Sequence, residues 1–314
     1  MESFFNGASI NFTKCLIVGK SDIADFKSIQ EALDSSCGSE APYKITVLSG
    51  EYHENLHIYQ PGLLLEGIGK VKIIGSRYAR QMGPDGTEIG TFQTATVFIN
   101  AADIVMKNIE VINDAGPGEL AGQAVALYNQ GDRIDFIGCS FKGYQDTICL
   151  GPLPEVQKNG QPFSGPALKT IFKENRVRFF SCYAEGTVDF IFGGGEGFFH
   201  SCEIKSLKRP DNQEGYITAA STPPERNGFL FEKCFLTAEA GVENVYLGRP
   251  WRPYAKTAFN SCRIGSHLHQ DHWDDWRNKE NRKTVDYQEN GNIFADGRAG
   301  ITSDWIKSSN QTGK

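Results

Sequence analysis

The sequence predicts an all-β fold, a single-domain right-handed parallel β-helix that spans residues 1–314. Three observations favour this solenoid. A short signature, an aromatic residue followed closely by a cysteine, recurs along the chain. Most apolar runs are short enough to be strands, and one segment alone has clear helical spacing. A solenoid of this kind buries its core by stacking successive coils, each of which contributes short parallel strands.

The helical segment is residues 25–36, DFKSIQEALDSS. The residues that would share one helical face are Phe26, Ile29, Ala32 and Leu33. We expect a short N-terminal helix here that covers the open end of the first coil. In the GEYHEN turn, Tyr52 and Glu54 are expected to be structural, through packing and hydrogen bonding.

The strand-like runs after this helix include YKITVL, VKIIG, TATVFIN, AVALYN and DRIDFIG, with Gly, Asn, Asp and Pro between them. A β-sandwich would have similar runs. The recurring coil signature counts against a sandwich, because unequal spacing with a fixed local pattern is typical of coils that carry loops of variable length.

The signature cysteines are Cys139, Cys182, Cys202, Cys234 and Cys262. MKNIEV resembles an earlier copy with Asn108 at the cysteine position. We expect the five thiols to form an interior ladder, because buried cysteine behaves as a small apolar residue. No CxxC pair indicates a zinc site, and a disulfide framework is not expected in a chain of this size without a signal peptide.

Composition narrows the function classes. The net charge of −6 comes without a basic stripe, which argues against nucleic-acid binding, and no apolar run is long enough to span a membrane. The first residues, MESFFNGASINFTKCLIVGK, lack the pattern of a signal peptide. We therefore expect a cytoplasmic protein as written, or a secreted one if the chain has been trimmed. We also expect a monomer with no cofactor or metal.

Four polar clusters interrupt the apolar runs. They contain Gln123 in GQAVAL, Gln145 and Asp146 in GYQDTI, Asp189 in TVDFIFGGG, and Arg249 with Trp251 in LGRPW. An unpaired carboxylate in an aromatic run is costly to bury, so Asp189 needs a partner or a task. Because neighbouring coils lie about 5 Å apart, the four clusters can stack on one face as a compact site.

Two neighbouring carboxylates cannot both ionise easily, so one takes a raised pKa and can donate a proton. Arg249 can hold the other carboxylate ionised and aim it, and the two glutamine amides can stabilise an oxyanion. This set favours acyl transfer by a carboxylate nucleophile. A glycosidase with two carboxylates is the alternative.

The segments GEYHENLHI, QAVAL, GYQDT, GTVDFIFG and LGRPW, in this order, resemble the signature blocks of pectin methylesterases, carbohydrate esterase family 8. DFKSIQEALD also resembles the N-terminal helix of that family, and the similarity runs from about residue 18 to about residue 306. The resemblance implies a right-handed β-helix that hydrolyses the methyl esters of homogalacturonan, or of its oligomers, through a covalent aspartyl intermediate.

The resemblance also implies roles for individual residues. Asp189 matches the nucleophile and Asp146 the general acid and base. Arg249 matches the residue that binds the nucleophile, and it should keep the pKa of Asp189 low. Gln123 and Gln145 match the amides that stabilise the oxyanion. The substrate-binding residues expected are Trp251, Thr91, Tyr144 and Phe192. The insertion at residues 151–169 is longer than in the plant-type enzymes and should reshape one wall of the cleft.

Two further readings remain. HLHQDH at 267–272 has the ligand spacing of a metal-dependent hydrolase, but no histidine follows it, so we expect a polar loop. A non-catalytic carbohydrate-binding solenoid would use the aromatic residues alone, whereas it has no need for the acidic pair. Trp273 or Trp276 could touch a substrate, although we expect packing roles for both.

Overall fold

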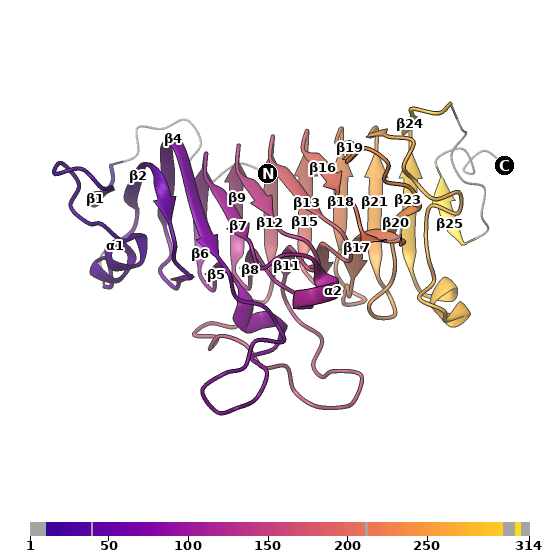
Figure 1. The fold of residues 1–314 in the computed structure, drawn as a ribbon, viewed down its shortest axis with the longest axis horizontal. Helices are drawn as coiled ribbons and strands as arrows, with labels where there is room; N and C mark the ends of the chain where they lie inside the picture. The colour runs from indigo at the N-terminus through magenta and orange to yellow at the C-terminus, as the bar shows by residue number, and fades with distance from the viewer. Residues whose placement is uncertain (1–10, 39, 211–212, 298–304, 309–314) are drawn as a thin grey trace.

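The protein is a stack of coils built from parallel strands (Figure 1). The computed structural model describes residues 11–38, 40–210, 213–297 and 305–308. The fold is the predicted right-handed parallel β-helix, and its strands run through a smaller and a larger sheet. The smaller sheet consists of β3 (Leu56–Ile58), β5 (Val97–Ile99), β8 (Leu127–Asn129), β11 (Ile148–Leu150), β14 (Ile191–Gly193), β17 (Gly215–Ala220) and β20 (Val245–Gly248).

The larger sheet contains the remaining named strands. Most coils contribute two consecutive strands to it. In chain order these are β1 (Lys14–Val18), β2 (Tyr43–Tyr52), β4 (Leu63–Gly75), β6 (Ala102–Lys107), β7 (Glu110–Asn113), β9 (Asp132–Ile137), β10 (Ser140–Lys142), β12 (Arg176–Phe180), β13 (Tyr183–Gly186), β15 (Glu196–His200), β16 (Glu203–Ser206), β18 (Phe229–Glu232), β19 (Phe235–Ala238), β21 (Lys256–Asn260), β22 (Arg263–Ile264), β23 (Asp286–Asn290), β24 (Ile293–Phe294) and β25 (Ile306–Ser308).

The cysteine signature marks the turn between the two strands that a coil adds to the larger sheet. The residue just before each cysteine has a left-handed backbone, with φ of 50° at Ser181, 53° at Ser201 and 54° at Ser261. One expectation was wrong by a residue. Asn108 takes this left-handed position, with φ of 54°, and the strand register places Ile109 opposite Cys139. Asn108 is tolerated at this turn because Asn adopts the left-handed backbone region more readily than most residues.

The interior is built from two ladders. The aromatic residue of each signature stacks on that of the next coil, as where the rings of Phe179 and Phe199 lie 4.3 Å apart and nearly parallel. The five signature thiols are buried, which confirms the predicted ladder. Each donates a hydrogen bond to a carbonyl one coil earlier; Cys202 Sγ, for example, lies 3.4 Å from Phe179 O. The signature therefore forms a continuous core.

The N-terminal end of the solenoid is closed by α1 (Ile29–Ser35), which buries Ile29, Ala32 and Leu33. The helix is shorter than the predicted 25–36, because Ser28 caps it by accepting a hydrogen bond from the Glu31 backbone N–H. Glu54 is hydrogen-bonded as expected. Its carboxylate accepts hydrogen bonds from Ser28 Oγ and from two backbone N–H groups of the first turn.

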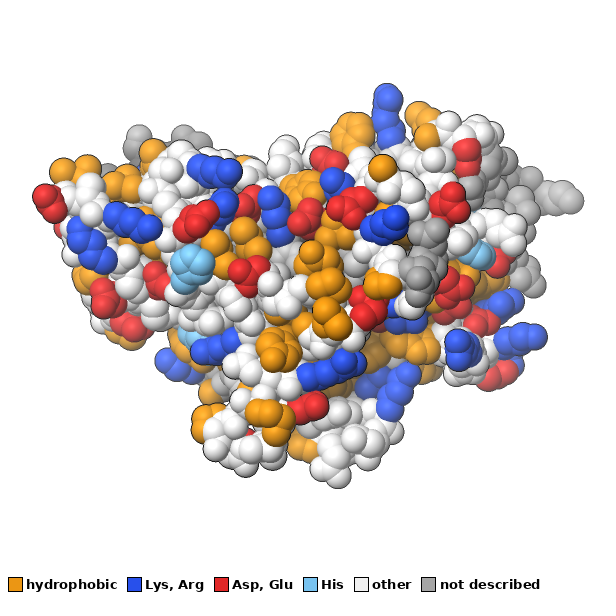
Figure 2. Space-filling view, viewed as in Figure 1, with side chains coloured by type: hydrophobic (Ala, Val, Ile, Leu, Met, Phe, Trp, Pro, Cys, Tyr) orange, Lys and Arg blue, Asp and Glu red, His pale blue; other side chains and the backbone are white. Residues whose placement is uncertain are grey.

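Ion pairs between neighbouring coils cover the outer face of the larger sheet, where basic and acidic side chains are interspersed (Figure 2). They include Lys142 with Glu110 and Arg178 with Asp135. This pairing leaves no single-sign field on that face. None of the helices in the described part of the chain has the length and apolar character needed to span a bilayer.

Two long loops project together from one edge of the solenoid (Figure 1). The first joins β4 to β5 and ends in a 3₁₀ turn at Thr91–Thr94, and the second joins β11 to β12 and contains the predicted insertion at 151–169. The rings of Phe92 and Phe163 meet edge to face across them, 5.4 Å apart. At the base of the second loop, Asn100 Oδ1 accepts hydrogen bonds from the backbone N–H groups of Lys169 and Thr170. These contacts place the insertion beside the smaller sheet.

Candidate active site

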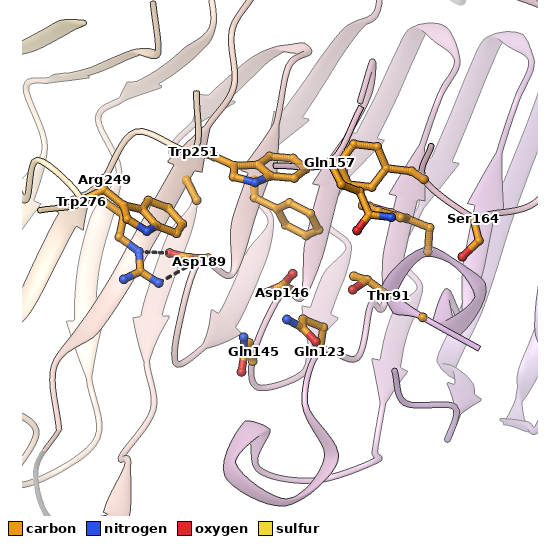
Figure 3. Close-up of a pocket in the computed structure, with 15 residues that line it drawn as sticks. Thr91, Gln123, Gln145, Asp146, Gln157, Ser164, Asp189, Arg249, Trp251 and Trp276 are labelled. Atoms are coloured by element: carbon orange, nitrogen blue, oxygen red, sulfur yellow. Dashed lines mark hydrogen bonds and ion pairs between the residues drawn. The ribbon is translucent and has the colours of Figure 1, made fainter. Parts of the chain in front are cut away.

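The polar clusters of the sequence converge on a cavity of about 400 Å³ between the smaller sheet and the two projecting loops (Figure 3). Of the residues expected in the site, those that line the cavity are Thr91, Gln123, Gln145, Asp146, Asp189, Phe192, Arg249 and Trp251. Tyr144 is half-buried and does not line it. The stacking of coils thus brings together residues that lie more than a hundred positions apart in the chain.

Asp146 and Asp189 occupy equivalent positions on adjacent coils. Ile148 pairs with Ile191 in the smaller sheet, and each aspartate stands two residues before its strand residue. Both have left-handed backbones, with φ of 66° at Asp146 and 50° at Asp189. Because Asp189 has a left-handed backbone, the alternation of side chains between the two faces of the sheet begins only with β14. Asp189 therefore does not share a strand face with Ile191. Non-glycine residues in this region are uncommon and cluster at functional sites.

The carboxylate of Asp189 is bound by Arg249. Arg249 Nε and Nη2 donate to Asp189 Oδ1 and Oδ2, and both distances are 2.8 Å (Figure 3). The guanidinium also lies over the rings of Tyr216 and Trp276, at 3.8 and 3.9 Å from their centroids. Two parallel hydrogen bonds and two aromatic faces fix the arginine, and they thereby fix the direction of the carboxylate.

The two carboxyl groups differ in their electrostatic surroundings. Burial and the nearby charge of Asp189 raise the pKa of Asp146 well above its ordinary value. Burial also raises the pKa of Asp189, while Arg249 pulls that pKa back. The expectation of a low pKa for Asp189 is therefore wrong in direction, because desolvation outweighs the arginine. The pKa of Asp146 is still expected to lie above that of Asp189, because of the two carboxyl groups it is Asp189 that accepts two hydrogen bonds from an arginine.

The two amides reach the cavity from different elements. Gln145 precedes Asp146 in the turn before β11, and Gln123 follows the short helix α2 (Gly118–Ala121). In Figure 3 both side chains lie on the same side of Asp146. The helix packs closely on Gln145, because a Cβ atom at Gly118 would lie 2.5 Å from Gln145 Oε1 and 2.8 Å from Gln145 Cβ. Glycine is required at this contact.

Aromatic residues form the opposite side of the cavity. Trp251 meets Phe192 and Phe163 edge to face, with centroids 5.8 Å apart in both pairs. Trp276 also lines the cavity, whereas Trp273 is buried and donates from Nε1 to Glu289. The expectation of a packing role is thus correct for Trp273 and incomplete for Trp276. Aromatic faces beside polar groups suit a sugar ring, which has apolar faces and a polar rim.

The sequence did not identify every lining residue. Gln157, Phe163 and Ser164 come from the insertion, and Phe92 comes from the loop before β5. The insertion was expected to reshape one wall of the cleft, and its residues Gln157, Phe163 and Ser164 line that cavity. No local motif marks them, because their position depends on where the loop folds back against the solenoid. The aromatic character of Phe163, within a polar and proline-rich stretch, was the one available signal.

The HLHQDH segment is a loop whose histidines have separate partners. His272 is buried against the Glu289 carboxylate, 3.0 Å from Nδ1 to Oε2, and His269 stacks on Tyr246. His267 is buried as well, so the segment is less polar in its surroundings than we expected. Within the described ranges, no three His, Cys, Asp or Glu side chains are grouped as metal ligands would be.

Fold and site together define a class of protein, the parallel β-helices with two carboxyl groups on adjacent coils in one cleft. The model of the Pectinesterase family matches residues 15–151 and 168–310. The chain belongs to this family, and it is a carboxylic ester hydrolase. The matched ranges leave out residues 152–167, which lie within the insertion.

Individual relatives agree with this assignment. Putative pectinesterase 14 of Arabidopsis thaliana is 31% identical over 290 residues, which cover 88% of this chain and 77% of that protein. The structure of pectin methylesterase from carrot is 25% identical, with a TM-score of 0.79 over 96% of this chain and 89% of its own. A pectin methylesterase in complex with a hexasaccharide is 26% identical, with a TM-score of 0.78 over 96% and 95%. The chain spans about half the length of several other curated relatives.

Proposed function

We propose that this protein is a pectin methylesterase, which hydrolyses the methyl esters of galacturonan to free carboxylate and methanol. The observation that supports this most strongly is the pairing of Asp189 with Arg249 beside an Asp146 that no cation of the described residues binds through two hydrogen bonds. A carboxylate that is held ionised and aimed is equipped to attack, and a neighbouring protonated carboxyl is equipped to donate.

In the first half-reaction, a carboxylate oxygen of Asp189 attacks the ester carbonyl carbon of the substrate. The carbonyl oxygen becomes an oxyanion, which the amide N–H groups of Gln123 and Gln145 stabilise. As the tetrahedral intermediate collapses, the bond to the methoxy oxygen breaks and Asp146 gives its proton to that oxygen. Methanol leaves, and the substrate acyl group remains on Asp189 as a mixed anhydride.

In the second half-reaction, the Asp146 carboxylate takes a proton from a water molecule, which attacks the acyl carbon of the substrate. The bond to Asp189 breaks, and Asp189 returns as a carboxylate held by Arg249. Asp146 is protonated again and the galacturonate product is released. Each step uses only side chains that line the cavity.

The substrate is methyl-esterified homogalacturonan or its oligomers, bound through Trp251, Thr91 and Phe192. A related esterase has been solved with a hexasaccharide, which supports an oligosaccharide ligand for this cleft. Because pectin is an extracellular polysaccharide, this function favours the secreted alternative over the cytoplasmic one. We expect a monomer to be the active form.

A glycosidase and a non-catalytic binding protein are the alternatives to exclude. Incubation with highly methylated galacturonan, as polymer and as short oligomers, should release methanol without new reducing ends. A glycosidase would produce reducing ends, and a binding protein would produce neither product. Asp189→Asn should reduce methanol release by at least about a thousandfold, because an amide cannot attack the ester.

The exposed Asp271 offers a matched control, since Asp271→Asn makes the same chemical change on the surface. Circular dichroism of both variants should match the wild-type protein. If Asp189→Asn releases methanol at a rate within tenfold of the wild-type rate, Asp189 is not the nucleophile.

A further inference from the structure

An ion pair joins the short helix α2 to the stretch that leads into β17. Arg209 Nε donates to Glu119 Oε1 at 3.0 Å, although the two residues stand 90 positions apart in the chain. Neither side chain lines the active-site cavity, and both are largely shielded from solvent, with exposed fractions of 17% and 25%. Water screens a shielded ion pair less than one at the surface, so this contact holds its two segments together more firmly.

The Glu119–Arg209 pair spans the coils that carry the two carboxyl groups of the site. In the smaller sheet, β11 and β14 lie between β8, which follows α2, and β17, which follows Arg209. Asp146 stands in the turn before β11, and Asp189 stands in the turn before β14. In Figure 1, α2 extends from the position of β8 toward β17. The ion pair therefore connects segments on either side of both turns.

Arg209 is held firmly at its own end of this connection. Its Nη2 donates to Gln213 Oε1 at 2.8 Å, and its Nη1 donates to the backbone carbonyl of Glu214. The carboxylate of Glu214 in turn accepts a hydrogen bond of 2.7 Å from the hydroxyl of Tyr216, whose ring lies under the guanidinium of Arg249. Arg209 is thus anchored to the same strand that supports the arginine of the site.

At the other end, the ion pair holds the helix that adjoins both glutamine amides. Gly118, directly before Glu119, packs so closely on Gln145 that a Cβ atom would lie 2.5 Å from its Oε1. Gln123 follows the helix after one residue. The helix has four residues and no side-chain cap at its N-terminus, so its position depends on tertiary contacts. A displacement of α2 would therefore move both amides.

We propose that Arg209 is a positioning residue for ester hydrolysis, which binds Glu119 and thereby keeps the amides of Gln123 and Gln145 aimed at the oxyanion. The inference rests on the proposed esterase function. Arg209 acts through these residues, because it does not line the cavity itself. Its positive charge has a second effect, since it helps to lower the pKa of Asp189.

A double-mutant cycle tests the connection, with kcat and KM measured from methanol release on a methylated oligogalacturonide. Arg209→Met and Glu119→Gln should each lower kcat about tenfold, because an oxyanion donor acts in the transition state. KM should change less than about twofold. The double variant should lose no more than either single variant, because both substitutions remove the same contact. Losses in kcat that multiply in the double variant would overturn the proposal.

The pH–rate profile distinguishes this role from a general loss of structure. Arg249 and Arg209 lower the pKa of Asp189, whereas burial and Asp274 raise it. Asp189 attacks only when ionised, so Arg209→Met should move the acidic limb to higher pH. Arg209→Lys keeps the charge and one donor to Glu119, so it should restore the acidic limb and most of kcat. Wild-type kcat in Arg209→Met would overturn the proposal.

Arg133→Met is the matched control, because Arg133 also binds a carboxylate of another coil, with 2.6 Å from Nε to Asp103 Oδ1, and does not line the cavity. It should retain the kcat and the pH profile of the wild type. An equal loss of kcat in Arg133→Met would show that any lost ion pair between coils slows the enzyme, and the specific role of Arg209 would fail.

Hydrogen exchange of residues 117–123, followed by mass spectrometry, separates this inference from the proposed function. Arg209→Met should speed the exchange of this segment about tenfold, and Arg133→Met should leave it unchanged. If the wild-type protein releases no methanol but exchange responds to Arg209→Met in this way, Arg209 still holds α2 and the esterase function fails. If methanol is released and neither kcat nor exchange responds to Arg209→Met, the esterase function stands and this inference fails.

Discussion

Arg249 and Asp189, 60 residues apart in the chain, form a bidentate pair whose two hydrogen bonds are both 2.8 Å long. The pair connects the end of β20 to the turn before β14, with β17 lying between them in the smaller sheet. Tyr216, from β17, lies under the guanidinium. The proposed nucleophile is therefore oriented by three successive coils, and its environment depends on their register.

Arg249→Lys should lower methanol release by about tenfold or more, because an ammonium cannot form two parallel hydrogen bonds with a carboxylate. Lysine keeps the positive charge but loses one of the two hydrogen bonds that pull down the raised pKa of Asp189, so that pKa should rise further by the share of the lost bond. Asp189 attacks only when ionised, and activity is lost as pH falls through its pKa. The acidic limb of the pH–rate profile should therefore move to higher pH.

Arg282→Lys is the control for this variant, because Arg282 also binds an aspartate, with 2.8 Å from Nε to Asp275 Oδ2, but its own side chain is exposed and it does not line the cavity. Its profile should match that of the wild type. An unshifted acidic limb in Arg249→Lys would show that the second hydrogen bond of the arginine does not lower the pKa of Asp189.

Asp146→Asn should slow both half-reactions and flatten the alkaline limb of the profile. The raised pKa of Asp146 keeps the acid protonated below that pKa, and activity is lost as pH rises through it. An asparagine side chain at position 146 does not titrate, so the loss of activity that follows deprotonation of Asp146 should be missing from the profile. A near-normal rate with an unchanged profile would mean that the proton comes from another group.

The same substitution should stabilise the fold at neutral pH. Above the ordinary carboxyl pKa of 3.8, the folded protein binds a proton at Asp146 that the unfolded chain releases, so stability falls as pH rises toward the raised pKa. Asparagine removes this cost, and we expect Tm at pH 7 to increase by at least about 2 °C. The increase should shrink toward pH 4 and should be missing from Asp271→Asn, whose carboxyl is exposed.

Gly118→Ala should reduce kcat about tenfold by displacing Gln145, since the new Cβ atom would lie 2.8 Å from Gln145 Cβ and one oxyanion donor would lose its place. Gly50→Ala is the control, because its nearest contact would be an ordinary 3.5 Å to Tyr52. Substrate KM should change less than kcat in Gly118→Ala. Full activity in this variant would show that α2 does not position the amide.

Thiol labelling tests the interior ladder. Of the eight cysteines, Cys15 and Cys37 are exposed and the other six are buried and free. Burial raises the pKa of the Cys139 thiol, which further suppresses its reaction as a thiolate. The native protein should react at two thiols and the denatured protein at eight. Replacing Cys15 and Cys37 with serine should leave no fast-reacting thiol, and rapid labelling of the ladder in that variant would contradict its burial.

The sequence by itself determined the coil architecture and most of the cleft. The aromatic–cysteine signature is local, because each coil needs the same left-handed turn and the same inward-facing pair. Even so, it misplaced Asn108 by one residue, since a turn residue and its buried neighbour cannot be distinguished without the register between coils. The sequence predicted the N-terminal helix, but α1 begins later than the predicted residue 25, because the cap at Ser28 sets its first residue.

Only the tertiary structure decided the environment of the site. The raised pKa of Asp189 results from burial by several coils, which no motif records. Trp276 and the insertion residues Gln157 and Phe163 line the cleft because loops that are distant in sequence fold back over the smaller sheet. Loop placement depends on long-range contacts such as that of Arg252 with Val156. A local pattern can specify a coil, but the position of a loop is fixed by what it packs against.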